Sequence, residues 1–225
     1  MSVEFIGYVG SRNHSEIIPP SGPVVDPKHI ETAAKIHENG GFDRVLVAFH
    51  SNSPESILIA QHAASVAPDL GLLIAHRPGF NAPTIVARQL ATLDNLTRGR
   101  VAVHIITGGS DLELQADGDH TTKAQRYART SEYLDIVRKE WSETSPFDYK
   151  GAFYDVRGAN SLVHPYNADA IPVYFGGSSA EAIEVAGKHA DVYALWGETY
   201  EQVAETVSRV RAAAAKHGRS PRFSL

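Results

Sequence analysis

The sequence contains no cysteine, which excludes disulfide bonds, thiolate metal sites and a cysteine nucleophile and fits a reducing compartment. It also lacks a surplus of positive charge: the formal net charge is -5, whereas nucleic acids and anionic membranes favour basic proteins. Residues 1–14 show neither the basic region nor the apolar run of a signal peptide, and no apolar run reaches the length of a membrane span. We therefore expect a cytoplasmic protein that binds neither nucleic acid nor membrane.

Short apolar runs alternate along the chain with longer amphipathic segments. The runs are rich in Val, Ile and Leu and are typical of buried strands, whereas the longer segments space their apolar residues as helices do. Asp26 before Pro27 predicts the start of the first helix, and Gly40-Gly41 predicts its end. Strands are predicted at residues 5–9, 44–49, 70–75, 101–106, 171–175, 191–196 and 223–225, and helices near residues 28–39, 54–67, 82–97, 121–142, 179–189 and 199–217.

This alternation predicts an α/β fold with a parallel sheet, either an open doubly wound sheet or a (β/α)8 TIM barrel. No glycine-rich dinucleotide fingerprint follows the first predicted strand, which favours the barrel. The chain holds about six strand–helix units and the start of a seventh strand, so we expect a single, incomplete TIM-barrel domain over residues 1–225. An insertion is expected near residues 108–120, and a small hairpin near residues 146–157 with its turn at Lys150-Gly151.

Polar residues gather after the predicted strands, where a parallel barrel places its functional site. Each has a bland explanation as well: His104 as a core histidine, Arg77 as the salt-bridge partner of a nearby helix, Trp196 as packing. Their concentration at one end of the sheet nevertheless favours a site. The residues concerned are Arg12, His14, His50, Ser53, His76, Arg77, His104 and Trp196.

The segment Gly176-Gly177-Ser178-Ser179 opens a predicted helix and has two interpretations. Glycines allow close backbone approach, and the unpaired N–H groups of a helix N-terminus attract phosphate. Alternatively, Ser178 and Glu181 form a capping box that satisfies those N–H groups without a ligand. Both remain open, although a late barrel strand is a place where phosphate sites recur.

Two other kinds of site have little support in the sequence. The histidines do not form an HxH or HExxH pattern, so no metal site is predicted. There is also no G-x-S-x-G elbow, so a hydrolase triad has no local support.

A set of short segments occurs in a characteristic order and spacing. These are residues 75–79 (AHRPG), 83–84 (PT) with 87–89 (ARQ), 91–94 (ATLD) with 99–100 (GR), 104–108 (HIITG), 125–127 (QRY), 174–179 (YFGGSS) and 195–198 (LWGE). Together they resemble the bacterial luciferase-like flavin-dependent monooxygenases, and most closely the alkanesulfonate monooxygenases, along essentially the whole chain.

The resemblance implies a TIM-barrel monooxygenase that binds reduced FMN supplied by a separate NAD(P)H-dependent flavin reductase. It implies that O2 is used to cleave the C–S bond of an organosulfonate, either an alkanesulfonate or a sulfosugar such as sulfoquinovose, releasing sulfite and an aldehyde. It also implies a homo-oligomer.

Carried over residue by residue, the resemblance implies a set of FMN contacts: Phe49, His50, His104, Glu113, Arg126, Tyr127, Ser178 and Ser179. A sulfonate is a permanent anion, so cationic and polar groups suit it. The expected substrate contacts are Arg12, His14, Ser53, His76, Arg77 and Trp196, and the expected catalytic residues are His50, Arg77 and Trp196. The chain departs from the family where His104 replaces a common asparagine and Ser53 replaces a cysteine of desulfonating members, which puts the substrate range in doubt.

Three alternatives stay open. One is oxygenation of a sulfone or another small molecule by the same kind of flavin enzyme. A second is a deazaflavin-dependent oxidoreductase, which would need room for a longer, charged cofactor tail. The third is a non-catalytic, truncated flavin-binding paralogue.

Overall fold

A sheet of seven parallel strands forms the centre of the computed structural model, which describes residues 3–15, 17–167 and 171–225. Each strand pairs with the next one along the chain, so the sheet runs in the order β1-β2-β3-β4-β7-β8-β9. Their bounds are β1 Ile6–Tyr8, β2 Arg44–Val47, β3 Gly71–His76, β4 Val101–Ile105, β7 Val173–Gly176, β8 Val192–Ala194 and β9 Arg222–Ser224.

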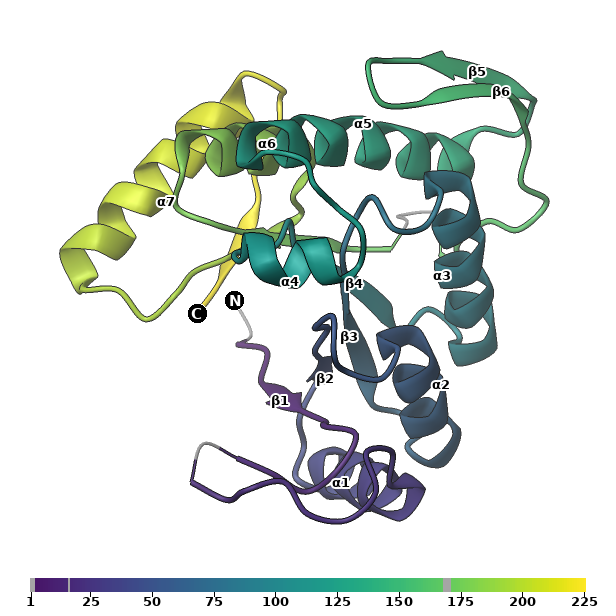
Figure 1. Cartoon of the computed structure of the whole chain (residues 1–225), viewed down its shortest axis with the longest axis vertical. Helices are drawn as coiled ribbons and strands as arrows, with labels where there is room; N and C mark the ends of the chain where they lie inside the picture. Colours follow the sequence, from purple (N-terminus) through teal and green to yellow (C-terminus); the bar gives the residue numbers. More distant parts are fainter. Residues whose placement is uncertain (1–2, 16, 168–170) are drawn as a thin grey trace.

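The sequential strand order decides between the two predicted architectures. A doubly wound sheet reverses its strand order at a switch point, whereas a barrel adds each new strand to the same edge. The sheet curls (Figure 1), and Arg222 Nη1 at the start of β9 donates to Glu4 Oε1, 2.8 Å away and just before β1. The prediction of a partial TIM barrel is therefore confirmed.

The helices follow the strands as predicted. Their bounds are α1 Pro27–Asn39, α2 Ser56–Val66, α3 Pro83–Thr97, α4 Asp111–Ala116, α5 Lys123–Ser142, α6 Ala180–His189 and α7 Tyr200–Ala215. The predicted limits of α1 are confirmed. The Asp26 side chain accepts a hydrogen bond from His29 N at 3.1 Å, and the helix ends at Gly40, followed by Gly41 in the left-handed region at φ +76°.

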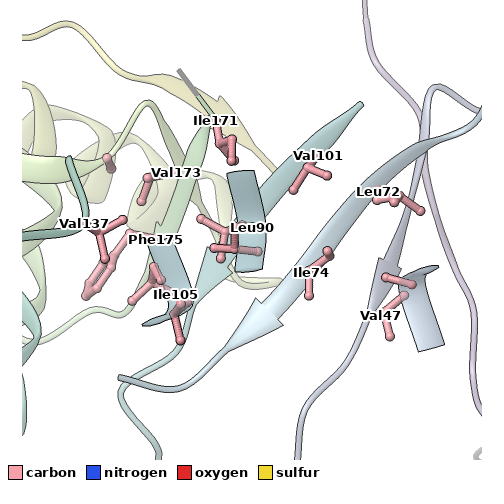
Figure 2. Packing of buried hydrophobic residues seen from close by; sticks show 14 of the residues in the cluster. Val47, Leu72, Ile74, Leu90, Val101, Ile105, Val137, Ile171, Val173 and Phe175 are labelled. Carbon is pink, nitrogen blue, oxygen red and sulfur yellow. The ribbon is translucent and has the colours of Figure 1, made fainter. Parts of the chain in front are cut away.

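Alternate side chains of each strand point to opposite faces of the sheet, and this divides the core in two. Side chains such as Ile74, Ile105 and Phe175 pack outward against the helices, where Leu90 of α3 and Val137 of α5 meet them (Figure 2). The alternate positions Leu73, Ala102, Tyr174 and Val192 form a smaller cluster on the inner, concave face. The same alternation decides which residues at the strand ends can face a ligand inside the barrel.

Two local features differ from the predictions. The turn of the hairpin expected near residues 146–157 is not at Lys150-Gly151: Lys150 pairs with Asp155, so residues 151–154 connect β5 (Phe147–Lys150) to β6 (Asp155–Ala159). The predicted insertion contains the short helix α4, which is too brief to show a period in the sequence. It forms because the Ser110 side chain caps Glu113 N, and because two acidic residues occupy its first turn.

Among the described residues, every helix is too short or too polar to cross a membrane.

Candidate functional site

His104 is the predicted site residue that strand β4 contributes. It belongs to the inner-facing positions of β4, and in register it lies between Ala75 of β3 and Tyr174 of β7. Burial lowers the pKa of His104 to about 4, because the charged imidazolium is poorly solvated there. The ring is therefore neutral at pH 7, with one nitrogen able to donate and the other able to accept a hydrogen bond.

The ends of β2 and β3 are joined by a buried cation. Arg77 follows β3 and is 3% exposed, and its guanidinium lies over the Phe49 ring, 5.1 Å from the ring centroid. Its Nη2 donates to Glu113 Oε1 at 2.9 Å, and its Nη1 is 4.0 Å from Asp117 Oδ2. Among the described residues, Arg77 Nε and Nη1 have no hydrogen-bond acceptor. Arg77 therefore forms the salt bridge to a nearby helix that the sequence analysis gave as its alternative role.

Glu113, on α4, connects this cation to the residues after β2. Burial raises the pKa of its carboxyl, but hydrogen bonds from Arg77 and from Ser51 N at 3.0 Å outweigh burial and hold that pKa below its usual value. His50 Nδ1 lies 3.6 Å from the same Glu113 oxygen. Four predicted site residues, Phe49, His50, Arg77 and Glu113, therefore come together.

A pocket of about 230 Å3 opens at the carboxyl ends of β1 and β2. Apolar side chains such as Val24 and Ile59 share its lining with polar ones. The Ser53 hydroxyl donates to His50 O and accepts from His50 N, both at 2.9 Å, so it orders the turn after β2. The pocket brings together four predicted residues: Arg12, His14, His50 and Ser53.

The loop between β7 and α6 forms a narrow glycine cradle, defined here as Gly176 to Ser179. A Cβ atom on Gly176 would lie 2.8 Å from Ala194 O, and Gly177 has φ +129°, so side chains are poorly tolerated at both positions. A Cβ on Gly177 would also come within 3.3 Å of Tyr127 Oη, which places this hydroxyl beside the cradle.

The capping box predicted between Ser178 and Glu181 is wrong. Ser179 is the N-cap of α6, and its side chain accepts a hydrogen bond from Ala182 N at 3.3 Å. The helix begins one residue later than the box requires, because Ser179 keeps extended backbone angles. Ser178 is consequently left exposed at the mouth of the cradle.

Arg126, in the first turn of α5, is buried and used within the protein. Its Nη1 donates to Thr121 O at 2.6 Å, and its Nη2 forms an ion pair with Asp111 Oδ1 at 2.9 Å. Helix α4 thus contacts both parts of the candidate site, through Asp111 at the α5 end and through Glu113 at the strand ends.

Two predicted residues are not brought to this group. His76 points outward from β3, is 4% exposed, and its Nε2 forms a hydrogen bond with Tyr133 Oη of α5 at 2.8 Å. Burial lowers the pKa of His76 to about 4. Trp196 follows β8 at the correct end of the sheet but is 71% exposed.

The sequence analysis assigned no role to three acidic residues near the candidate site, Asp111, Asp117 and Asp119. Asp119 is buried and pairs with Arg129 Nη2 at 2.5 Å. Burial raises the pKa of Asp119, but the hydrogen bonds from Arg129 and Thr121 and the nearby charge of Arg129 outweigh burial and lower this pKa to about 2. Both residues line a second, open cleft of about 560 Å3. The sequence does contain a signal for these ion pairs, because four acidic residues at 111–119 are followed by arginines at 126 and 129.

The described residues show no candidate metal site. They contain no group of three or more His, Asp or Glu side chains placed to hold a metal ion.

A curled parallel sheet with polar residues gathered at its carboxyl rim is the architecture of a (β/α)-barrel enzyme. Within that class the sequence profile of one family, described as luciferase-like monooxygenase, matches residues 3–225. The chain belongs to the luciferase-like monooxygenase family.

Solved structures show the same fold in more distant proteins. The EDTA monooxygenase from Chelativorans sp. BNC1 has a TM-score of 0.83 and 20% identity, with 97% of this chain and 61% of that chain covered. A riboflavin lyase with modified FMN and riboflavin has a TM-score of 0.83 and 18% identity, covering 98% and 60%. The coenzyme F420-dependent tetrahydromethanopterin reductase from Methanopyrus kandleri has a TM-score of 0.79 and 19% identity, covering 98% and 63%. The chain thus spans about three-fifths of these structures, and the likeness shows the fold.

The buried neutral His76 predicts a loss of stability in acid. Its pKa in the folded protein, about 4, lies below the ordinary value of 6.5, so between these pH values the unfolded chain binds more protons. The His76 contribution to the free energy of unfolding is intact above pH 6.5 and falls by on the order of 3 kcal/mol as the pH approaches 4.

Urea unfolding of the full-length protein at several pH values checks this, with His76→Gln as the variant. Glutamine can still bond to Tyr133 but does not titrate, so the variant should lose less stability between pH 7 and pH 4 than the natural protein. An identical loss in both proteins would show that His76 does not carry the effect.

Proposed function

We propose that the full-length protein is a two-component monooxygenase that uses reduced FMN and O2 to cleave the C–S bond of an organosulfonate. The products are sulfite and an aldehyde; one oxygen atom enters the aldehyde and the other leaves as water, while reduced FMN supplies the two electrons. A separate NAD(P)H-dependent flavin reductase provides the reduced FMN. The observation that carries the proposal is the pocket lined by Arg12, His14 and His50, in which Arg12 is a permanent cation and which adjoins the strand ends of a luciferase-like barrel.

The glycine cradle fits the phosphate of FMN. Backbone can approach a ligand closely at Gly176 and Gly177, and α6 directs the N–H groups of its first turn toward the same place. Ser178 is free to donate its hydroxyl, whereas Ser179 already caps the helix. The Tyr127 hydroxyl offers a further donor beside the cradle. That a riboflavin lyase holding modified FMN shares this fold supports the assignment.

The isoalloxazine ring is proposed to lie inside the curled sheet, near His104. A bound reduced flavin supplies the electrons that activate O2. The neutral His104 ring can donate a hydrogen bond there without adding a buried charge. In this respect the histidine can do what the asparagine of many relatives does.

The pocket at the ends of β1 and β2 is proposed to hold the sulfonate. Its volume of about 230 Å3 suits a small organic anion. Arg12 offers paired N–H donors for two sulfonate oxygens, and His14 and His50 offer ring nitrogens. Asn52 adds an amide that can bond to a hydroxyl, so a sulfosugar is a candidate alongside an alkanesulfonate. Arg77 and Trp196 remain proposed substrate contacts at the rim, whereas His76 is removed because it faces α5.

Three rival functions remain open. The F420-dependent reductase with the same fold keeps deazaflavin-dependent hydride transfer as one alternative, and oxygenation of a sulfone is another. A non-catalytic flavin binder is the third possibility, and it differs from the others in turning over no substrate.

An anaerobic titration with reduced FMN, followed by O2 and a panel of sulfonates that includes a sulfosugar, tests the proposal. We expect saturable binding of reduced FMN and release of sulfite that depends on it. The matched variant Arg12→Ala should raise the KM for the sulfonate about tenfold or more while flavin affinity stays unchanged, because it removes a charge-assisted hydrogen bond.

Three other outcomes would change the proposed function or the role of Arg12. Flavin binding without sulfite from any sulfonate would contradict desulfonation and favour sulfone chemistry. Binding of a deazaflavin in place of FMN would favour hydride transfer. An unchanged KM in Arg12→Ala would remove Arg12 from the substrate site.

We also propose that the protein is a homo-oligomer that associates through α2 and α3. Helix α2 carries no charged residue, although Leu58 on its outer side is 64% exposed. Leu58, Ile85 and Leu96 line an apolar groove of about 350 Å3 between the two helices. Exposed apolar surface of this kind is typical of an interface.

Light scattering of the full-length protein measures the association. We expect a dimer or tetramer that shifts toward the monomer in Leu58→Glu, because a charge would be buried in the interface. The control Tyr200→Glu introduces the same charge at a side chain that is 90% exposed on α7, and it should leave the mass unchanged. A natural protein that is monomeric at micromolar concentration would overturn the proposal.

A further inference from the structure

Glu113 uses one carboxylate oxygen to connect three parts of the chain. Its Oε1 accepts hydrogen bonds from Arg77 Nη2 at 2.9 Å and from Ser51 N at 3.0 Å, and it lies 3.6 Å from His50 Nδ1. Arg77 follows β3, residues 50 and 51 follow β2, and Glu113 itself belongs to α4. Because an oxygen atom has two lone pairs, these two donors occupy the hydrogen-bonding capacity of Oε1.

The buried guanidinium of Arg77 needs Glu113 as its anionic partner. Arg77 is 3% exposed, and its remaining close carboxylate, Asp117, is 4.0 Å from Nη1. A buried arginine without a paired anion is strongly unfavourable, so removal of the Glu113 charge must disturb the Arg77 side chain. Arg77 lies over Phe49, so a shift of the Arg77 side chain also affects the residues that follow β2.

Helix α4 is held at this place mainly by charged groups. Leu114 is its buried side chain, whereas Leu112 is 81% exposed. Gly108 and Gly118, on either side of the helix, have φ +87° and +85°, which glycine adopts without strain. With so little apolar burial, the bonds from Glu113 to Arg77 and Ser51 fix where α4 meets the strand ends.

We infer that Glu113 is a positioning residue: it sets the turn after β2 so that His50 faces the proposed substrate pocket. His50 lines that pocket, and its backbone is held from the other side by the Ser53 hydroxyl. Glu113 and Ser53 together define the turn that presents His50. This assignment replaces the flavin contact that the family resemblance implied for Glu113, and it rests on the proposed function only for its effect on catalysis.

Hydrogen exchange in the full-length protein tests the inference without any turnover. Glu113→Gln keeps the size of the side chain but weakens the bonds to Ser51 N and Arg77. We expect amide exchange in peptides covering residues 50–54 and 109–118 to rise about tenfold or more, because a charge-assisted hydrogen bond is lost. The control Asp117→Asn removes a charge from the same segment without a close bond, and its exchange at residues 50–54 should match the natural protein.

The kinetic arm separates positioning from flavin contact. If Glu113 positions His50, Glu113→Gln should lower kcat about tenfold or more while the affinity for reduced FMN changes less than about twofold. Weaker FMN binding with unchanged exchange at residues 50–54 would overturn the inference and restore the flavin contact. Glu113→Asp, which keeps the charge on a shorter side chain, should recover part of the exchange protection if Glu113→Gln proves unstable.

The two arms also separate this inference from the proposed function. A natural protein that releases no sulfite would contradict the proposed function, and the exchange result would still decide the role of Glu113 in the turn. Unchanged exchange in Glu113→Gln would overturn the inference even in an enzyme that desulfonates its substrate.

Discussion

The pairing of parallel strands in sequence order is the constraint on which the site depends. Each strand joins the same edge of the sheet, so all seven carboxyl ends meet at one rim. Within each strand, alternation then assigns side chains to the inside or the outside. His104 faces the interior and His76 faces α5, although both occupy neighbouring strands at similar heights.

Paired charges hold the segment that covers this rim. Arginines at positions 77, 126 and 129 contact carboxylates from residues 111–119. The first two are buried and Arg129 is partly buried, and Arg77 and Glu113 form the pair closest to the proposed substrate pocket. Such pairs add little net stability compared with apolar packing, but they fix geometry, because moving either partner leaves a buried charge alone. The site therefore combines a rigid sheet with a short helix whose place depends on electrostatics.

Much of the fold was predictable from the sequence, because strand and helix periods differ and the runs are clear. The start of α1 followed from Asp26 and Pro27. The order of the runs predicted a parallel sheet, and the missing dinucleotide fingerprint after the first strand favoured the barrel that the strand order shows. Alternation along β3 also places His76 on the outer face, because Leu72 and Ile74 share a face with it. The predicted cap at Ser178 failed because two serines in a row offer two caps, and local sequence does not choose between them.

The contacts of Glu113 were beyond the sequence for a different reason. Its partners, Ser51 and Arg77, lie 62 and 36 residues away, and α4 is too short to leave a periodic signal. The concentration of histidine and arginine after the strands correctly indicated that Arg12, His14 and His50 would meet. The alternative interpretation of Arg77, as the salt-bridge partner of a nearby helix, matches its ion pair with Glu113 of α4.

Reduced FMN is proposed to lie between the inner face at His104 and the glycine cradle at the start of α6. Hydrogen exchange of the full-length protein, measured anaerobically with and without reduced FMN, tests it most directly. If reduced FMN lies there, it slows the exchange of amides at residues 104–110 and 176–182 and leaves exchange on the outer faces of α2 and α3 unchanged. Saturable flavin binding that protects neither segment would contradict it.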